Sequence, residues 1–330
     1  MSRHLLCLED LGPLGLSRAL DMAEATGLGH LLEGKSIALF FEHPSARTRN
    51  AFEAAVFQLG GHPVTIRAEE IGIDSRESAE DVARTLACFH SVICGRVASH
   101  STLDRMATAL DRAGVAVPVV NLLSDLEHPS QAVADLLTLR AHLGELERKT
   151  LTYVGDHNNV SRSLVAACAL VGMRIHIAGP PGYQMGREEL ARASARGAEV
   201  QLFEDPFEAA TEADAIYTDV WTSMGQESER SARLAAFAGY TVDEDLVALA
   251  ASDAIVLHCL PAHRGEEITA GVLEGPRSAV WEQAANRMHA MRGVFTWLAY
   301  AGLREPLDDP VTGRSIPAPG PGGADHRGHR

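Results

Sequence analysis

Polar residues that could bind an anion follow two predicted strands, each where a helix is expected to begin. Ser45-Ala46-Arg47-Thr48-Arg49 comes after the apolar run 36–41. It combines hydroxyl and guanidinium donors with the free backbone N–H groups of a helix N-terminus. His128-Pro129-Ser130-Gln131 also opens a predicted helix, and Pro129 suits its first turn. Taken singly, each segment has an ordinary interpretation as well: a capped helix with solvated arginines, or a turn with an incidental histidine.

The order of these segments along the chain favours a shared site. Arg96 ends another predicted strand, so three polar segments follow three strands of the first half. In an open parallel sheet, ligands bind beyond the carboxyl ends of the strands. Convergence of three independent segments on one edge predicts an anion site there.

The second half carries polar segments after two further strands. Gly155-Asp156-His157-Asn158-Asn159-Val160 has the position of a dinucleotide fingerprint but lacks the G-x-G-x-x-G pattern, which disfavours a nicotinamide-dependent oxidoreductase. Segment 219–225 begins with Asp219, whose carboxylate could pair with an amine. A plain polar loop is the alternative.

The stretch 258–267 is the most unusual, because Cys259 follows His258 and precedes His263. Residues of these types can form a metal site, and a cysteine beside histidines can act as a nucleophile. Adjacent residues in an extended chain point to opposite faces, so we expect His258 and Cys259 not to bind one ion together. No HExxH or paired CxxC pattern accompanies them, and we expect no metal site.

These segments lie between alternating strand and helix patterns, which are typical of βαβ units and parallel sheets. Strands are predicted at 36–41, 63–66, 91–94, 117–121, 150–154, 174–178, 199–203, 215–218, 254–257 and 278–281. These strands are too many for one sheet, which favours two α/β domains. Helices are predicted at 48–59, 131–143 and 283–300, followed by a Pro- and Gly-rich tail, 306–330, that we expect to be disordered.

Composition excludes several classes of protein. The 330 residues carry a formal net charge of −15 and are 46% hydrophobic, typical of a globular chain that repels nucleic acid and anionic lipid. No run approaches the roughly 20 apolar residues that span a bilayer. The five scattered cysteines fit reduced thiols. We expect a cytoplasmic protein with neither nucleic-acid nor membrane partners.

Together the segments resemble the aspartate/ornithine carbamoyltransferase family over nearly the whole chain, from about residue 3 to 303. The matching pieces, in order, are Ser45-Ala46-Arg47-Thr48-Arg49, Arg96, His128-Pro129-Ser130-Gln131, Gly155-Asp156-His157-Asn158-Asn159-Val160, 219–225, His258-Cys259-Leu260-Pro261 and Asn286-Arg287.

The resemblance implies two Rossmann-like domains, each a mostly parallel sheet flanked by helices. Residues 1–140 would bind carbamoyl phosphate and 141–282 ornithine, with the C-terminal helix, about 283–303, packing back on the first domain. It also implies a homotrimer or a multiple of trimers that needs no cofactor. The implied reaction transfers the carbamoyl group to the δ-amine of L-ornithine, giving L-citrulline and phosphate.

The resemblance also implies a role for each matching residue. Arg47, Arg96, His128 and Cys259 would act in catalysis. The carbamoyl phosphate site would be formed by Ser45, Ala46, Arg47, Thr48, Arg96, His128, Gln131, Cys259, Leu260 and Arg287. Ornithine would be held by Asn159, Asp219, Ser223 and Met224. No side chain stands out as the base, which leaves the departing phosphate as the expected proton acceptor.

The residues leave alternative functions open. Lysine is one methylene longer than ornithine and is hard to exclude, because one methylene discriminates by only about 1–3 kcal/mol. Further alternatives are a carbamoyltransferase whose acceptor is putrescine, and a non-catalytic homologue.

Two departures from the family pattern also stand out. Ala46 replaces a Thr of many relatives, which predicts a modestly weaker carbamoyl phosphate site. Loop 69–77 lacks the Gln or His that relatives often send into a neighbouring site, and Ser75 or Arg76 would have to substitute.

Overall fold

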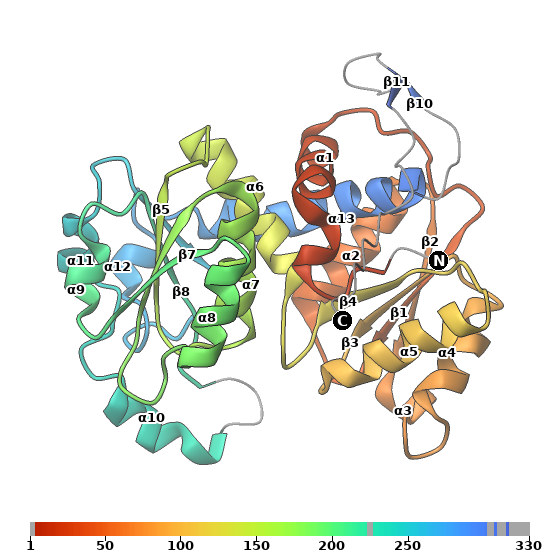
Figure 1. The fold of residues 1–330 in the computed structure, drawn as a ribbon, viewed down its shortest axis with the longest axis horizontal. Helices are drawn as coiled ribbons and strands as arrows, with labels where there is room; N and C mark the ends of the chain where they lie inside the picture. Colours follow the sequence, from red (N-terminus) through yellow and green to blue (C-terminus); the bar gives the residue numbers. More distant parts are fainter. Residues whose placement is uncertain (1–3, 223–226, 302–306, 309–314, 317–330) are drawn as a thin grey trace, which may run out of the picture.

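The computed structural model describes residues 4–222, 227–301, 307–308 and 315–316 of the 330-residue chain. It contains two parallel sheets, each flanked by helices in its own α/β domain (Figure 1). The strands lie in the order β2-β1-β3-β4 in the first sheet and β7-β6-β5-β8-β9 in the second. Both arrangements confirm the expected fold class.

Except for its edge strand β2, the first sheet is mostly buried on both faces, because successive apolar side chains point to opposite faces. In β1, Ala38 and Phe40 pack with α4 and α5, whereas Ile37, Leu39 and Phe41 face the core shared with α1, α2 and α13. The strands are β1 Ser36–Phe41, β2 His62–Arg67, β3 Val92–Arg96 and β4 Val119–Leu123. The helices are η1 Leu8–Leu11, α1 Gly12–Glu24, α2 Ala46–Gln58, α3 Ala68–Ile71, α4 Ala79–Ala87, α5 His100–Arg112 and α6 Pro129–Leu143.

The second sheet repeats this plan, and four of its strands have the predicted bounds. Its strands are β5 Thr150–Val154, β6 Arg174–Ala178, β7 Glu199–Phe203, β8 Ala215–Thr218 and β9 Ile255–His258. Its helices are α7 Asn159–Val171, α8 Arg187–Ala195, α9 Pro206–Ala210, η2 Glu227–Glu229, α10 Arg230–Ala236, α11 Glu244–Leu249 and α12 Ala270–Leu273.

The predicted strand 278–281 is wrong. Ser278 forms only an isolated bridge to Val256, and α13, Val280–Ala301, begins two residues later. Val280 and Trp281 are the first two residues of this helix, and their side chains differ in burial: Val280 is fully buried, whereas Trp281 is 53% exposed. Burial then returns at Gln283 and Arg287, which lie on the Val280 side of the helix.

Helix α13, blue in Figure 1, packs against α1, α2 and α6 of the first domain, as expected. Phe295 meets Phe52 of α2 edge-to-face, with ring centroids 6.2 Å apart. Gly293 lies so close to α1 that a Cβ there would come within 2.0 Å of the Ala19 carbonyl oxygen. The last helix is therefore built into the domain that carries the predicted anion site.

Of the predicted tail, the structure describes only β10, Leu307–Asp308, and β11, Ser315–Ile316, which pair antiparallel. The rest of the predicted tail lies outside the described residues. In the part of the chain that is described, no helix has the length and apolar character needed to cross a membrane.

Candidate functional site

The first sheet places Ser45 and Arg96 at one edge. Strands β1 and β3 are neighbours, with Phe41 beside Arg96 at their carboxyl ends, whereas β2 lies on the far side of β1 and β4 beyond β3. The chain order thus reverses between β1 and β3, which is where doubly wound sheets bind ligands. There, Arg96 Nη1 donates a hydrogen bond of 3.1 Å to Ser45 Oγ.

Helix α2 presents its N-terminus to the same edge. The helix begins at Ala46, two residues before the predicted start, and Ser45 is its N-cap residue, but the Ser45 side chain makes no capping bond among the described residues. The first backbone N–H groups of the helix have no intrahelical acceptor, and together they favour an anion. Thr48, in the first turn, is buried and accepts a 2.8 Å hydrogen bond at Oγ1 from Arg287 Nη2 of α13.

Three arginines make this edge strongly cationic. Burial, followed by the charges of Arg287 and Arg47, lowers the pKa of Arg96 to about 10. Burial also lowers the pKa of Arg287, and Arg47 adds to the effect. The Nε atoms of Arg96 and Arg287 are buried without a hydrogen-bond partner among the described residues. Buried cationic donors of this kind fit a bound anion.

His128, at the start of α6, is 4% exposed and lies beside these arginines. Its backbone N–H donates to Ser163 Oγ of α7 at 2.8 Å, and its ring Nδ1 lies 3.2 Å from Ser130 Oγ. Burial, with the charges of Arg287 and Arg96, holds the His128 pKa well below its usual value of 6.5. The ring is therefore neutral at pH 7.

Gln131, one turn further along α6, is 1% exposed. Its Nε2 donates to Asp135 Oδ1 at 2.8 Å, and its Oε1 is buried without a partner among the described residues. The site thus combines cationic donors with one amide oxygen that can accept an N–H group.

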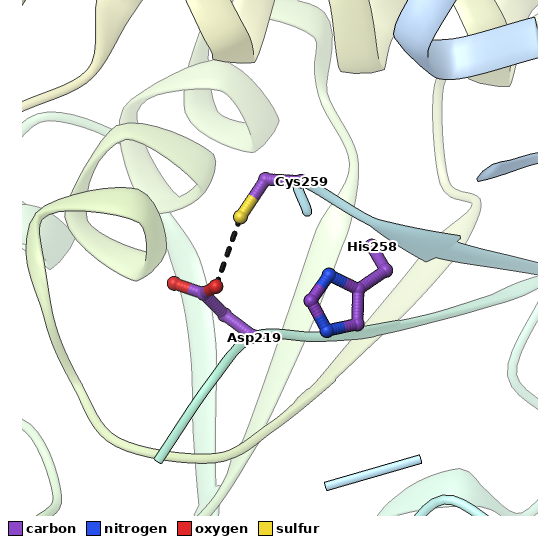
Figure 2. Close-up of side chains that lie close together, drawn as sticks. All are labelled: Asp219, His258 and Cys259. Carbon is purple, nitrogen blue, oxygen red and sulfur yellow. Dashed lines mark hydrogen bonds between the residues drawn. The ribbon is translucent and has the colours of Figure 1, made fainter. Parts of the chain in front are cut away.

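The second domain contributes a pair of side chains, shown in Figure 2. Cys259 donates its S–H to Asp219 Oδ1 at 2.9 Å. Asn158 Nδ2 donates to Asp219 Oδ2, also at 2.9 Å. Burial, followed by the charge of Asp219, raises the pKa of Cys259 well above its usual value. Cys259 is therefore a neutral thiol at pH 7 rather than a thiolate nucleophile.

Asn158 was missed as a site residue in the sequence analysis. Besides holding Asp219, its Oδ1 accepts from the backbone N–H groups of Val160 and Ser161 and so caps α7. An Asn directly before a helix that follows a strand is a capping signal, and that signal could have identified it.

Among the predicted ornithine-binding residues, Asn159 reaches back to the first domain, where its Nδ2 donates to the Ser124 carbonyl oxygen at 2.7 Å. Ser223 and Met224 lie outside the described residues. Leu260 has a φ of 60°, and its N–H donates to His258 Nδ1 at 2.9 Å. This bond fixes the loop that carries Cys259.

The argument that His258 and Cys259 point apart does not hold. Asp219, His258 and Cys259 each place one possible ligand atom within 4.8 Å of the others, because β9 ends at His258 and Cys259 is no longer in an extended strand. Their hydrogen bonds account for this arrangement. Cys259 uses Sγ toward Asp219, and His258 uses Nδ1 toward Leu260 and Nε2 toward Glu267 Oε1, 3.0 Å away.

Comparison with known proteins identifies two family domains in the chain. Residues 3–141 match the carbamoyl-P binding domain of aspartate/ornithine carbamoyltransferases, and residues 147–298 match their Asp/Orn binding domain. An ornithine carbamoyltransferase from Acidothermus cellulolyticus is 47% identical over 96% of this chain and 100% of its own length. One from Archaeoglobus fulgidus is 44% identical over 89% of this chain and 96% of its own length.

Solved structures agree with the sequence relatives. The ornithine carbamoyltransferase from Pyrococcus furiosus superposes with a TM-score of 0.85 at 38% identity, covering 92% of this chain and 98% of its own. The enzyme from Thermus thermophilus gives a TM-score of 0.81 at 41% identity, covering 91% and 99%.

Proposed function

The chain belongs to the aspartate/ornithine carbamoyltransferase family, and from this premise we propose that it transfers the carbamoyl group of carbamoyl phosphate to the δ-amine of L-ornithine. The products are L-citrulline and phosphate, and the reaction belongs to arginine metabolism. The observation that carries the proposal is the pair of buried arginines, Arg96 and Arg287, whose Nε donors lack partners among the described residues beside the α2 N-terminus.

The phosphate of carbamoyl phosphate binds at this cationic edge. The α2 N-terminus supplies the backbone N–H groups of its first turn, and the phosphate oxygens match the guanidinium donors. The binding residues are Ser45, Ala46, Arg47, Thr48, Arg96 and Arg287. The net charge of −15 makes this cluster a local exception in an acidic protein.

The carbamoyl group lies against Arg96, His128 and Gln131. Attack by an amine builds negative charge on the carbonyl oxygen, which fixed donors in a dry site stabilise. Arg96 remains cationic at neutral pH because its lowered pKa is still about 10. The unpartnered Gln131 Oε1 accepts from the carbamoyl nitrogen, which is a donor.

Ornithine approaches from the second domain. The Asp219 carboxylate, already oriented by Asn158 and Cys259, pairs with an ammonium group of the amino acid. The binding site for ornithine is completed by Asn159, Ser223 and Met224. Cys259 and the Leu260 carbonyl lie against the reacting amine and the carbamoyl group.

The attacking amine must be neutral, and the proton it loses goes to the departing phosphate. Two of the nearby alternatives are poorly suited to hold it. Burial, with the charges of Arg287 and Arg96, lowers the pKa of His128, and burial with the charge of Asp219 raises the pKa of Cys259, which is therefore already protonated.

We assign residues 1–140, with α13, to carbamoyl phosphate and residues 141–282 to ornithine. A cytoplasmic homotrimer, or a multiple of trimers, is the assembly that we propose. Large exposed apolar side chains on the first domain support an interface there: Phe57 is 76% and Phe89 is 70% exposed. Ser75 and Arg76 are also exposed and available to a neighbouring site.

The acceptor is tested by incubating purified protein with carbamoyl phosphate and, separately, ornithine, lysine, putrescine or aspartate. We expect more ureido product with ornithine than with putrescine, because Asp219 recognises an amino acid, and more than with aspartate, because the thiol of Cys259 offers no cation for a second carboxylate. Product with putrescine and none with ornithine would refute the acceptor. No product with any amine would support the non-catalytic alternative.

A further inference from the structure

Asp135 of α6 is a fully buried carboxyl group that no step of the proposed reaction uses. Its Oδ1 accepts two hydrogen bonds, from Gln131 Nε2 at 2.8 Å and from Gln283 Nε2 of α13 at 2.7 Å. Its Oδ2 is buried without a partner among the described residues. A carboxyl group in such a place is costly unless its hydrogen bonds serve the fold or the site.

The bond to Asp135 decides how the Gln131 amide is turned. An amide has one oxygen and one NH2 group, and Asp135 offers an acceptor, so Nε2 faces Asp135. This leaves Oε1 on the opposite side of the amide, where it has no partner among the described residues. An unpartnered acceptor on a residue one helical turn from His128 matches the donor that a carbamoyl NH2 group offers.

Gln283 fixes Asp135 from the last helix. The Gln283 Oε1 accepts from the His258 backbone N–H at 2.8 Å, so its Nε2 must face Asp135 and the Tyr217 hydroxyl, which is 3.2 Å away. The His258 N–H thus fixes the orientation of the Gln283 amide, which donates to Asp135. Asp135 in turn fixes the orientation of the Gln131 amide.

We propose that Asp135 is a positioning residue, held by Gln283, that turns the Gln131 amide so that its oxygen receives the carbamoyl nitrogen. The inference rests on the proposed function in that carbamoyl phosphate is taken as the ligand. Asp135 itself does not touch the substrate.

Equilibrium binding to the full-length protein tests this without the acceptor amine. Carbamoyl phosphate and inorganic phosphate are titrated separately, since phosphate occupies only the cationic edge. For Asp135→Ala we expect affinity for carbamoyl phosphate to fall by about tenfold and affinity for phosphate to stay within about twofold. Asp135→Asn keeps an oxygen for both amides and should recover carbamoyl phosphate binding to within about threefold.

The matched control is Thr138→Val. Thr138 Oγ1 accepts a 2.9 Å hydrogen bond from Asn286 Nδ2, which also joins α6 to α13. Its hydroxyl donates to the Ala134 carbonyl oxygen rather than to Gln131. This variant should bind both ligands as the wild type does. Asp135 would be merely structural if Thr138→Val lost as much affinity for carbamoyl phosphate as Asp135→Ala. The same conclusion would follow if Asp135→Ala lost as much affinity for phosphate as for carbamoyl phosphate.

A double variant separates positioning from independent effects. If Asp135 acts through Gln131, adding Asp135→Ala to Gln131→Ala causes no further loss of carbamoyl phosphate affinity. Additive losses would overturn the proposal, and so would an Asp135→Asn variant as weak as Asp135→Ala. The wild-type product assay tests the proposed function separately, because selective binding loss can occur whether or not citrulline forms.

Discussion

Arg287 of the last helix donates a 2.8 Å hydrogen bond to the Thr48 hydroxyl in the first turn of α2. The bond joins the C-terminal helix to the helix N-terminus at which the phosphate is proposed to bind. The site of the first domain is thus completed by a residue encoded after the second domain. We therefore expect correct docking of α13 to be a condition for phosphate binding as well as for stability.

Replacing Arg287 with Met should abolish most activity, because it removes a buried cation from the site while keeping much of the packing. Loss of one fixed donor to the reacting group costs about 2.7–4 kcal/mol, so kcat/KM should fall by about 10²–10³. Arg292→Met is the control, since Arg292 lies on the same helix and contacts the Ala25 carbonyl oxygen instead. Equal loss in both variants would mean that α13 docking, and not the Arg287 charge, is what matters.

Ala46→Thr should strengthen carbamoyl phosphate binding. Ala46 is the first residue of α2 and is exposed, so a hydroxyl there adds a donor at the helix N-terminus without disturbing the core. One added hydrogen bond at this exposed position corresponds to roughly 1 kcal/mol, or about a fivefold lower KM for carbamoyl phosphate with kcat little changed. Steady-state kinetics at saturating ornithine measure it, and a raised KM would contradict the placement of the phosphate.

Sequence reasoning located most of this edge because helix starts and strand ends have local signals. Ser45 and His128 follow strands, and Arg96 ends one. Because β1 and β3 are neighbours, Ser45 and Arg96 lie together. Asp135 had no comparable signal. The single carboxyl group of α6 becomes meaningful only when α13 packs against α6 and brings Gln283 to it.

The error at 278–281 has a similar origin. A short apolar run has no period of its own, and strand and helix starts look alike over four residues. Its neighbour Gln283, buried and bonded to the His258 N–H, shows that the run begins a helix whose polar face points into the site. Tertiary packing supplied information that local pattern lacked.

Cys259 should resist alkylation at pH 7.5 while Cys88 reacts. The Cys259 pKa is raised well above its usual value by burial and by Asp219, so almost no thiolate is present, whereas Cys88 is exposed. Treatment with iodoacetamide followed by peptide mass spectrometry gives the extent of modification at each cysteine. If Cys259 were modified faster than Cys88, its thiol would be ionised, which would contradict a thiol that donates a hydrogen bond to Asp219.

Asp135 should make stability fall as the pH rises. Burial raises the pKa of Asp135 from 3.8 to about 7, so between these values the folded protein holds a proton that the unfolded chain has released. Relative to Asp135→Asn, the wild type should lose free energy of unfolding from about pH 4 to about pH 7 and show a constant difference above that.

Urea unfolding of both proteins at several pH values measures this difference. Burial also raises the pKa of Glu127 to about 7, but Glu127 is present in both proteins and cancels in the comparison. A difference that stays constant between about pH 5 and about pH 7 would mean that Asp135 is already ionised in the folded protein throughout this range.

The central claim is tested most directly by a crystal structure of the protein with carbamoyl phosphate bound. The account predicts phosphate oxygens on the α2 N-terminus within hydrogen-bonding distance of Arg96 and Arg287, with the carbamoyl nitrogen at Gln131 Oε1. Carbamoyl phosphate bound at another edge, with these two arginines turned away from it, would contradict the account.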